Sequence, residues 1–425
     1  MKTAIAVFSI AAILGSLSCS SPPTRSRAES EQRVLALAPA TGADSLAGEI
    51  RAKEAALAKH ETPAGWIALG RVWVRLARHT SDPGFYLSAD ACASRALASA
   101  PSSVPGRNLR ALVLLNAHRF AEARNLAREI LVEAPDDLDA LATASDASLE
   151  LGDLAAAGAA VDRMREIRPG LPAFSRASWL CWLRGDREGA LRFAALAVDA
   201  GDARDPEPTA WVLVQAAQIY WNTGDVAGAD AGYDAALARV PNFPPALLGK
   251  GRIAMARGRH AAAVGVFERA FRANPLAETA WLLGDAQDAA GDHTAAARTW
   301  QQLDTGDLSR DRRTVSAFLS AKGRDPERAL ALIEEESKTR GGPFTDDALA
   351  WALFRSGRLD EARAASDRAL SPGLREPALL FHAGAIRLAL GRQQEGLQFL
   401  KRAVAANPAF ERDGAEEART LLTRR

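Results

Sequence analysis

Residue types that commonly do chemistry are present in this chain, but their spacing does not match a catalytic or metal-binding motif. No two of its six histidines stand four residues apart with a glutamate between them, the arrangement that binds zinc in metalloproteases. A single histidine without such partners is more often a packed or surface residue than a ligand. The sequence therefore predicts no catalytic residue and no metal site at His60, His79, His118, His260, His293 and His382.

A glycine-rich stretch is the candidate for binding a nucleotide cofactor. Gly249-Lys250-Gly251 loosely matches the start of a dinucleotide-binding fingerprint, which requires a strand before it and a helix opening after it. The surrounding residues predict neither element. The chain also has no Walker A sequence and no Gly-x-Ser-x-Gly nucleophile motif. We therefore expect a protein that binds no cofactor and is not an enzyme.

The elements that must position any functional side chain are helices, because Ala, Leu and Arg dominate and β-branched residues are sparse. The chain has 425 residues and is 48% hydrophobic, which is enough to bury a large core. Its 53 basic residues balance 52 acidic ones, for a formal net charge of +1. No long-range field therefore attracts nucleic acid or an anionic membrane. The composition predicts an all-α protein that does not bind nucleic acid.

The N-terminus predicts an export signal over residues 1–18. Met1-Lys2 is a short positive start, and Ala4 to Leu17 is an apolar run. This run is too short to cross a bilayer, which needs about 20 residues. Small residues lead into Cys19 and resemble the lipobox of bacterial lipoproteins. Two outcomes stay open: a lipid on Cys19 anchors the exported protein to a membrane, or ordinary cleavage releases it into the periplasm. Residues 19–44 then predict a flexible tether.

Two landmarks recur with a period near 34 residues, which indicates a repeat architecture. One is a proline series at Pro101, Pro135, Pro169, Pro241, Pro275 and Pro408. The other is a glycine followed by Asp or Arg, at Gly152, Gly185, Gly224, Gly258, Gly291, Gly323, Gly357 and Gly391. The glycine ends a first helix in a left-handed conformation, and the proline ends a second helix. Each unit is therefore expected to be a helix hairpin.

One unit shows the pattern in full, with Ala217, Tyr220, Gly224, Ala229, Tyr233, Ala236 and Pro241. It resembles the tetratricopeptide repeat, whose period is 34. The resemblance implies an all-α, right-handed superhelical solenoid of antiparallel helix hairpins. It divides the chain into a leading helix at 45–62, an array of about ten helix pairs over 63–408, and a C-terminal capping helix at 409–425.

The resemblance also implies a binding face. In this family, fixed positions of the first helix of each pair point to the concave side of the superhelix, where partner proteins or peptides bind. Carried onto this sequence, these positions are Trp179, Trp182, Trp211, Gln218, Trp221, Asn222, Arg252, Met255, Trp281, Asp285, Asp288, Trp351, Phe354 and Arg355.

Export signal and array together predict a non-catalytic scaffold or adaptor of the bacterial cell envelope. Its partners are expected to be other proteins or peptides, since aromatic and arginine side chains are enriched in binding hot spots. Contact with a membrane is expected only through a lipid on Cys19. The aromatic groove leaves an alternative open, an envelope protein that binds carbohydrate or a small ligand.

Overall fold

A computed structural model describes residues 32–37, 45–80 and 82–423. Every regular element in this part of the chain is helical, and none of its helices is long and apolar enough to span a bilayer. The expected export signal and Cys19 lie outside the described residues. One part of the expected tether departs from the prediction. Residues 32–36 are helical, and the Ala36 carbonyl accepts a hydrogen bond from Trp73 Nε1 at 3.0 Å.

Ten helix pairs form the array in the described residues, preceded by α2 (Ser45–Lys59) and followed by α23 (Arg412–Thr423). The first helices are α3 (Pro63–Thr80), α5 (Val104–Asn116), α7 (Leu138–Glu150), α9 (Leu171–Leu183), α11 (Glu207–Asn222), α13 (Pro244–Ala256), α15 (Ala277–Ala289), α17 (Arg312–Ala321), α19 (Pro343–Arg355) and α21 (Pro377–Ala389). The second helices are α4 (Phe85–Ser99), α6 (Phe120–Glu133), α8 (Leu154–Ile167), α10 (Arg187–Asp199), α12 (Val226–Arg239), α14 (His260–Ala273), α16 (His293–Gln301), α18 (Pro326–Glu336), α20 (Leu359–Leu370) and α22 (Gln393–Ala406). A short 3-10 turn, η2 (Leu308–Arg310), precedes α17.

The hairpin from α7 to α8 shows why the repeat forms. Gly152 adopts a φ of +83°, which reverses the chain after α7 at little steric cost. The next residue, Asp153, caps α8 by accepting a hydrogen bond from the Ala156 amide at 3.0 Å. Ala157 is then fully buried where the two helices cross. The small side chain allows the helices to approach closely, which confirms the hairpin predicted from the glycine series.

The glycines of the loose nucleotide motif serve packing inside α13. A Cβ on Gly249 would lie 2.0 Å from Tyr233 Cζ, and one on Gly251 would lie 2.3 Å from Phe267 Cε1. Both aromatic rings are buried at helix crossings. Gly249 and Gly251 are therefore required because large side chains of α12 and α14 fill the space beside them.

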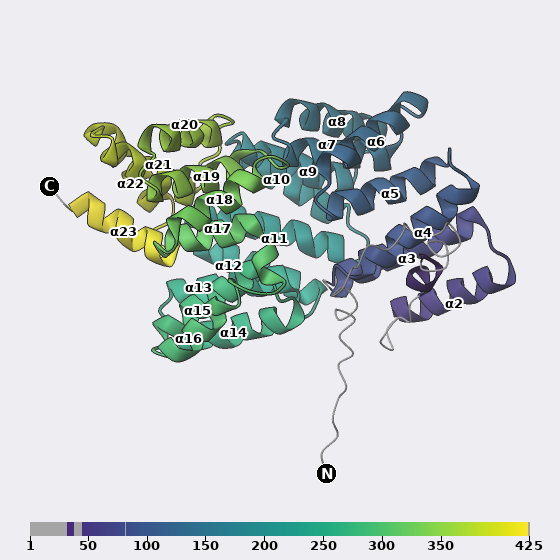
Figure 1. The fold of residues 1–425 in the computed structure, drawn as a ribbon, viewed down its shortest axis with the longest axis horizontal. Helices are drawn as coiled ribbons and strands as arrows, with labels where there is room; N and C mark the ends of the chain where they lie inside the picture. Colours follow the sequence, from purple (N-terminus) through teal and green to yellow (C-terminus); the bar gives the residue numbers. More distant parts are fainter. Residues whose placement is uncertain (1–31, 38–44, 81, 424–425) are drawn as a thin grey trace, which may run out of the picture.

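Successive coils of the superhelix are in direct contact, and we call this arrangement the closed coil. Helices α19 to α21 lie beside α9 to α11 (Figure 1), and side chains from both groups of helices share one apolar cluster. The Gly341 amide donates a hydrogen bond to the Glu150 carbonyl at 2.8 Å. Farther along, Asn407 Nδ2 donates to the Trp221 carbonyl at 2.8 Å, across 186 residues of sequence. The second coil therefore begins to contact the first after five to six repeats.

Backbone packs directly on backbone at this contact. Gly185, with a φ of +77°, and Gly373, with a φ of +114°, approach so closely that neither has room for a side chain. A Cβ on Gly185 would lie 2.5 Å from the Gly373 carbonyl oxygen, and one on Gly373 would lie 2.4 Å from that of Arg184. We call this contact the seam; it joins turns 150–152, 184–185 and 221–224 to turns 340–342, 373 and 406–407.

Candidate binding face

The inner face of the closed coil is formed by the first helices of the pairs, and the residues predicted from the repeat register differ in exposure there. One of them, Trp211, is clearly exposed, at 47%. Those that are half-buried are Trp179, Gln218, Arg252, Met255, Trp281, Asp288, Phe354 and Arg355. Those that are buried are Trp182, Trp221, Asn222, Asp285 and Trp351.

The buried tryptophans correct the expectation of an open aromatic stripe. Trp182 Nε1 donates a hydrogen bond to Glu376 Oε1 at 2.9 Å, and the two residues lie 194 positions apart. Trp351 stacks on His382, with ring centroids 4.1 Å apart. Trp221 lies at the seam, where its carbonyl is bonded across the coils. Contact between the coils buries Trp182 and Trp221, and packing against the next helix pair buries Trp351, so these rings do not form an open surface.

Helix α23 contacts the inner side of the array beyond the last helix pair. Arg412 Nη1 lies 2.8 Å from Asp288 Oδ2 on α15, and Glu417 Oε2 lies 3.1 Å from Arg355 Nη2 on α19. Two of the predicted binding residues, Asp288 and Arg355, are therefore already paired with α23. The helix covers part of the inner face in addition to the apolar end of the array.

Lys322 links α23 to α15. Its Nζ lies 2.7 Å from Asp285 Oδ1 and 2.6 Å from Asp413 Oδ2. Burial raises the pKa of Asp285 to about 6, although the Lys322 charge acts in the opposite direction. Asp285 is 7% exposed, so this predicted binding residue is occupied in the free protein.

Carboxylates from three parts of the chain interact electrostatically with one another. Asp347 on α19 receives a hydrogen bond from His382 on α21, with Oδ2 and Nδ1 2.9 Å apart. Glu376, just before α21, and Glu411, just before α23, interact electrostatically with Asp347 and with Arg252. We call Asp347, Glu376 and Glu411 the central carboxylate cluster.

Arg252 on α13 is held beside this cluster by its own partners. Its guanidinium forms an ion pair with Glu278 on α15, and its Nη1 lies 3.5 Å from Gln218 Oε1 on α11. Gln218 Nε2 in turn donates to Asn222 Oδ1 at 3.2 Å, while the buried Asn222 Nδ2 has no hydrogen-bond partner among the described residues. Tyr233 also donates its hydroxyl to Gln218 Oε1, at 3.2 Å. The structure therefore brings Gln218, Asn222 and Arg252 together as one hydrogen-bonded group.

The pKa values of Glu376 and Glu411 show that nearby charges and hydrogen bonds only partly offset the effect of burying these carboxylates. Burial raises the pKa of Glu376 to about 7 against the hydrogen bond from Trp182. Burial also raises the pKa of Glu411, and the charges of His382 and Arg252 lower it only in part. For His382, burial alone would lower the pKa, but the charge and hydrogen bond of Asp347 raise it.

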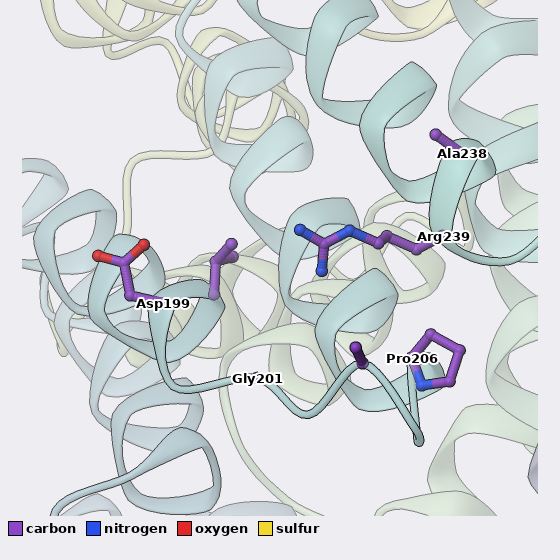
Figure 2. A pocket seen from close by; sticks show the side chains of 7 residues that line it. Asp199, Gly201, Pro206, Ala238 and Arg239 are labelled. Carbon is purple, nitrogen blue, oxygen red and sulfur yellow. The ribbon is translucent and has the colours of Figure 1, made fainter.

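An open hollow of about 520 Å³ lies beside the segment 201–206, which connects α10 to α11 (Figure 2). Arg239 extends its guanidinium over it, and Asp199 stands at its edge (Figure 2). The lining is otherwise small or apolar: Val198, Gly201, Ala203, Pro206 and Ala238.

The repeat geometry is matched by a family model. The tetratricopeptide-repeat model fits residues 108–172, 214–278, 248–304 and 348–409, which together make up more than half of the chain. The chain belongs to the tetratricopeptide-repeat (TPR) family. In the part of this TPR protein that the structure describes, no group of three or more His, Cys, Asp or Glu side chains is arranged to hold a metal ion.

Solved structures of helical repeat proteins are similar to this TPR protein in fold. PilW, a widely conserved type IV pilus biogenesis factor, is 18% identical, with a TM-score of 0.40 over 48% of this chain and 96% of PilW. The Cut9–Hcn1 hetero-tetramer of APC/C is 14% identical, with a TM-score of 0.38 over 95% of this chain and 96% of that one. The human IFIT1 dimer with PPP-AAAA is 15% identical, with a TM-score of 0.47 over 88% and 93%. No curated protein matches the sequence significantly.

The register of the TPR repeats accounts for one of the residues missed by sequence analysis. Asp347 occupies the same position in its repeat as Trp281 in the repeat that begins at 277, so it was identifiable as an inward residue. Glu376 and Glu411 stand before their helices, outside the inward positions. They join the inner face only because the coil closes. Nothing in their local sequence signals this.

Proposed function

We propose that this TPR protein is a non-catalytic scaffold of the bacterial cell envelope and that its inner face binds a segment of a partner protein. The TPR fold supports a protein-interaction scaffold. The observation that supports the proposed site is the partial exposure of three charged side chains, those of Arg252, Glu376 and Glu411. Protein surrounds all three side chains, yet each keeps solvent-accessible surface. A partner segment is thus able to reach these polar groups. Because protein surrounds them, a hydrogen bond to one of them is stronger than in water, so a segment that lacks the matching donor or acceptor binds less well.

The inner face does not favour the carbohydrate-binding alternative. Flat stacking on a sugar requires open aromatic faces, whereas Trp182, Trp221 and Trp351 are 2 to 3% exposed. Trp211 is the exposed tryptophan of the predicted set, and it already makes an edge-on contact with Phe243, with centroids 6.4 Å apart. Nucleic acid is disfavoured as well, because the charges of Asp347, Glu376 and Glu411 would repel phosphates.

The envelope location is the part of the proposal that rests on the N-terminal sequence. Metabolic labelling with a fatty acid tests it directly in the full chain. Label on the wild-type protein and none on a Cys19→Ala variant would support a lipid anchor. An unlabelled protein in the periplasmic fraction would support the soluble exported form, and retention of the full chain in the cytoplasm would exclude both.

Site-specific photocrosslinking tests the binding face. We place p-benzoylphenylalanine at the inner position of Trp211 and, as a control, at the outer, solvent-exposed position of Glu334. The proposal expects one protein to be crosslinked from the inner position and not from the outer one, in intact cells. Equal crosslinking from both positions, or binding of the purified chain to a glycan array alone, would contradict it.

A further inference from the structure

We infer that helix α23 occupies, in the free protein, the place on the inner face that an amphipathic helix of the partner protein takes. The partner helix carries an arginine followed by acidic residues one and five positions later. The inference rests on the proposed function, because it names the kind of segment that the inner face binds. It is carried by the ion pairs that α23 makes with the array.

Three ion pairs join α23 to three successive repeats, and we call them the α23 ion pairs. They are Arg412–Asp288 at 2.8 Å, Asp413–Lys322 at 2.6 Å and Glu417–Arg355 at 3.1 Å. At about 3.6 residues per turn, the three α23 residues lie within roughly 140° of one side of the helix. Since Asp288 and Arg355 are inward positions of the repeat register, α23 lies on the surface where a partner is expected.

The array keeps its own charges paired without α23. Each receptor of the α23 ion pairs has a second partner within the array: Asp288 has His293 at 2.7 Å, Lys322 has Asp285 at 2.7 Å, and Arg355 has the Ser320 carbonyl at 2.9 Å. Departure of a helix is costly when it leaves a buried charge unpaired, and these second partners prevent that. The site is therefore able to exchange one helix for another.

The apolar contacts of α23 are made mainly by small side chains. Its buried residues are Gly414, Ala415 and Ala418. Within the array, by contrast, α12 and α14 bury the large rings of Tyr233 and Phe267 at helix crossings. Because stabilisation grows with the apolar area removed from water, burial holds α23 in place less strongly than it holds these helices.

An open hollow of about 370 Å³ gives access to the α23 ion pairs. Its lining comes from one side of the helix: Asp413, Glu416, Glu417, Thr420 and Leu421. Two of the three α23 ion pairs lie on this side, and the side chains of Asp413 and Glu417 are 41% and 36% exposed. Water, salt and the charges of an incoming helix are therefore able to compete for Lys322 and Arg355.

The order of charges on the array defines the partner helix. The array presents the negative Asp288 and then the positive Lys322 and Arg355. A helix with an arginine and acidic residues at the spacing found in α23 matches all three, whereas the reversed charges meet repulsion at each. Small residues three and six positions after the arginine, like Ala415 and Ala418, allow the same close approach.

A peptide with the sequence of residues 409–423, labelled with fluorescein, tests the inference on the full-length protein. The opened variant, Arg412→Ala with Glu417→Ala, changes α23 and leaves every receptor residue in place. Its affinity for the peptide, measured by anisotropy, should exceed that of the wild type by about tenfold or more. The reason is that the tethered α23 of the wild type competes at a high effective concentration and keeps the site occupied.

The matched control, Glu416→Ala with Arg419→Ala, removes two exposed charges of α23 that lie outside the α23 ion pairs. It should bind the peptide as the wild type does. A second peptide with Arg412→Glu, Asp413→Arg and Glu417→Arg should bind the opened variant about tenfold more weakly or less. Adding Arg355→Glu to the opened variant should narrow this difference, because the new glutamate pairs with the arginine of the second peptide.

Equal affinity of the wild type and the opened variant for the first peptide, or no binding to either, would overturn the inference. Equal binding of the two peptides to the opened variant would remove the charge pattern from it. Formation of a dimer by the opened variant in light scattering would assign the site to α23 of a second copy and contradict a partner protein.

Hydrogen exchange tests the same inference in the unaltered chain, in case the variants fold poorly. Raising the salt concentration should speed exchange of the α23 amides and leave that of the α21 amides unchanged, since salt screens exposed ion pairs. Exchange of α23 that does not respond to salt would mean that α23 is a fixed part of the fold. The proposed function is tested apart from this. Crosslinking of one protein from position 211, with the same yield in the wild type and the opened variant, would keep the binding face and remove the exchange of α23.

Discussion

Replacing Gly185 by alanine measures how much the seam contributes to the fold. The chain contains a matched control at Gly357, which has the same φ of +77° and no atom within 4 Å of an added Cβ. Both substitutions force alanine into the left-handed region, at a cost of roughly 1 kcal/mol. At Gly185, the new Cβ would also lie 2.5 Å from the Gly373 carbonyl oxygen, so the two coils must separate.

The seam makes the expected effects unequal. Gly357→Ala should lower the free energy of unfolding by about 1 kcal/mol, which is the backbone cost alone. Gly185→Ala should lower it by about 2–4 kcal/mol, because the backbone overlap adds the ~1–3 kcal/mol typical of overpacking. Urea unfolding of both variants and of the wild type gives these values from the shift of the midpoint.

Hydrogen exchange locates the effect within the molecule. The Gly341 amide, which donates to the Glu150 carbonyl across the seam, should exchange faster in Gly185→Ala and at the wild-type rate in Gly357→Ala. The radius of gyration from small-angle X-ray scattering should rise in the first variant only. Equal losses of stability, with unchanged exchange at Gly341, would refute the closed coil in solution.

Other predictions concern single side chains of the interior. Burial raises the pKa of Glu376 to about 7 in the folded chain, whereas the ordinary value of 4.5 applies in the unfolded chain. The free energy of unfolding should therefore fall by up to ~3 kcal/mol as the pH rises from 4.5 to 7. Over the same pH range, the urea midpoint of Glu376→Gln should fall less than that of the wild type. Lys322→Met should lower the free energy of unfolding by ~3 kcal/mol, because it leaves the Asp285 carboxylate buried without its ion-pair partner. Lys338→Met removes an exposed ion pair and should lower it by about 0.5 kcal/mol or less in the same urea assay. Trp211→Ala should change the thermal midpoint little, since the ring is 47% exposed, yet it should weaken crosslinking to a partner from neighbouring inner positions.

The hairpins follow from short-range rules, which is why the sequence predicts them. The turn at Gly152 needs only a residue that tolerates positive φ, a capping aspartate and a small residue at the crossing, and all three lie within six positions. The family register then predicts which side chains point inward, such as those of Gln218 and Arg252. These predictions depend on neighbours along the chain and within one helix pair.

Contact between the coils depends on the sum of the small rotations between successive helix pairs. The sequence of any one repeat therefore does not determine it. Each helix pair rotates slightly against the previous one, and five to six pairs must accumulate the rotation and rise that bring Glu150 to Gly341. A small error in the predicted rotation between helix pairs, added over five to six pairs, would place the two coils out of contact. The burial of Trp182, and the presence of Glu376 and Glu411 on the inner face, follow from closure and could not be predicted from local patterns.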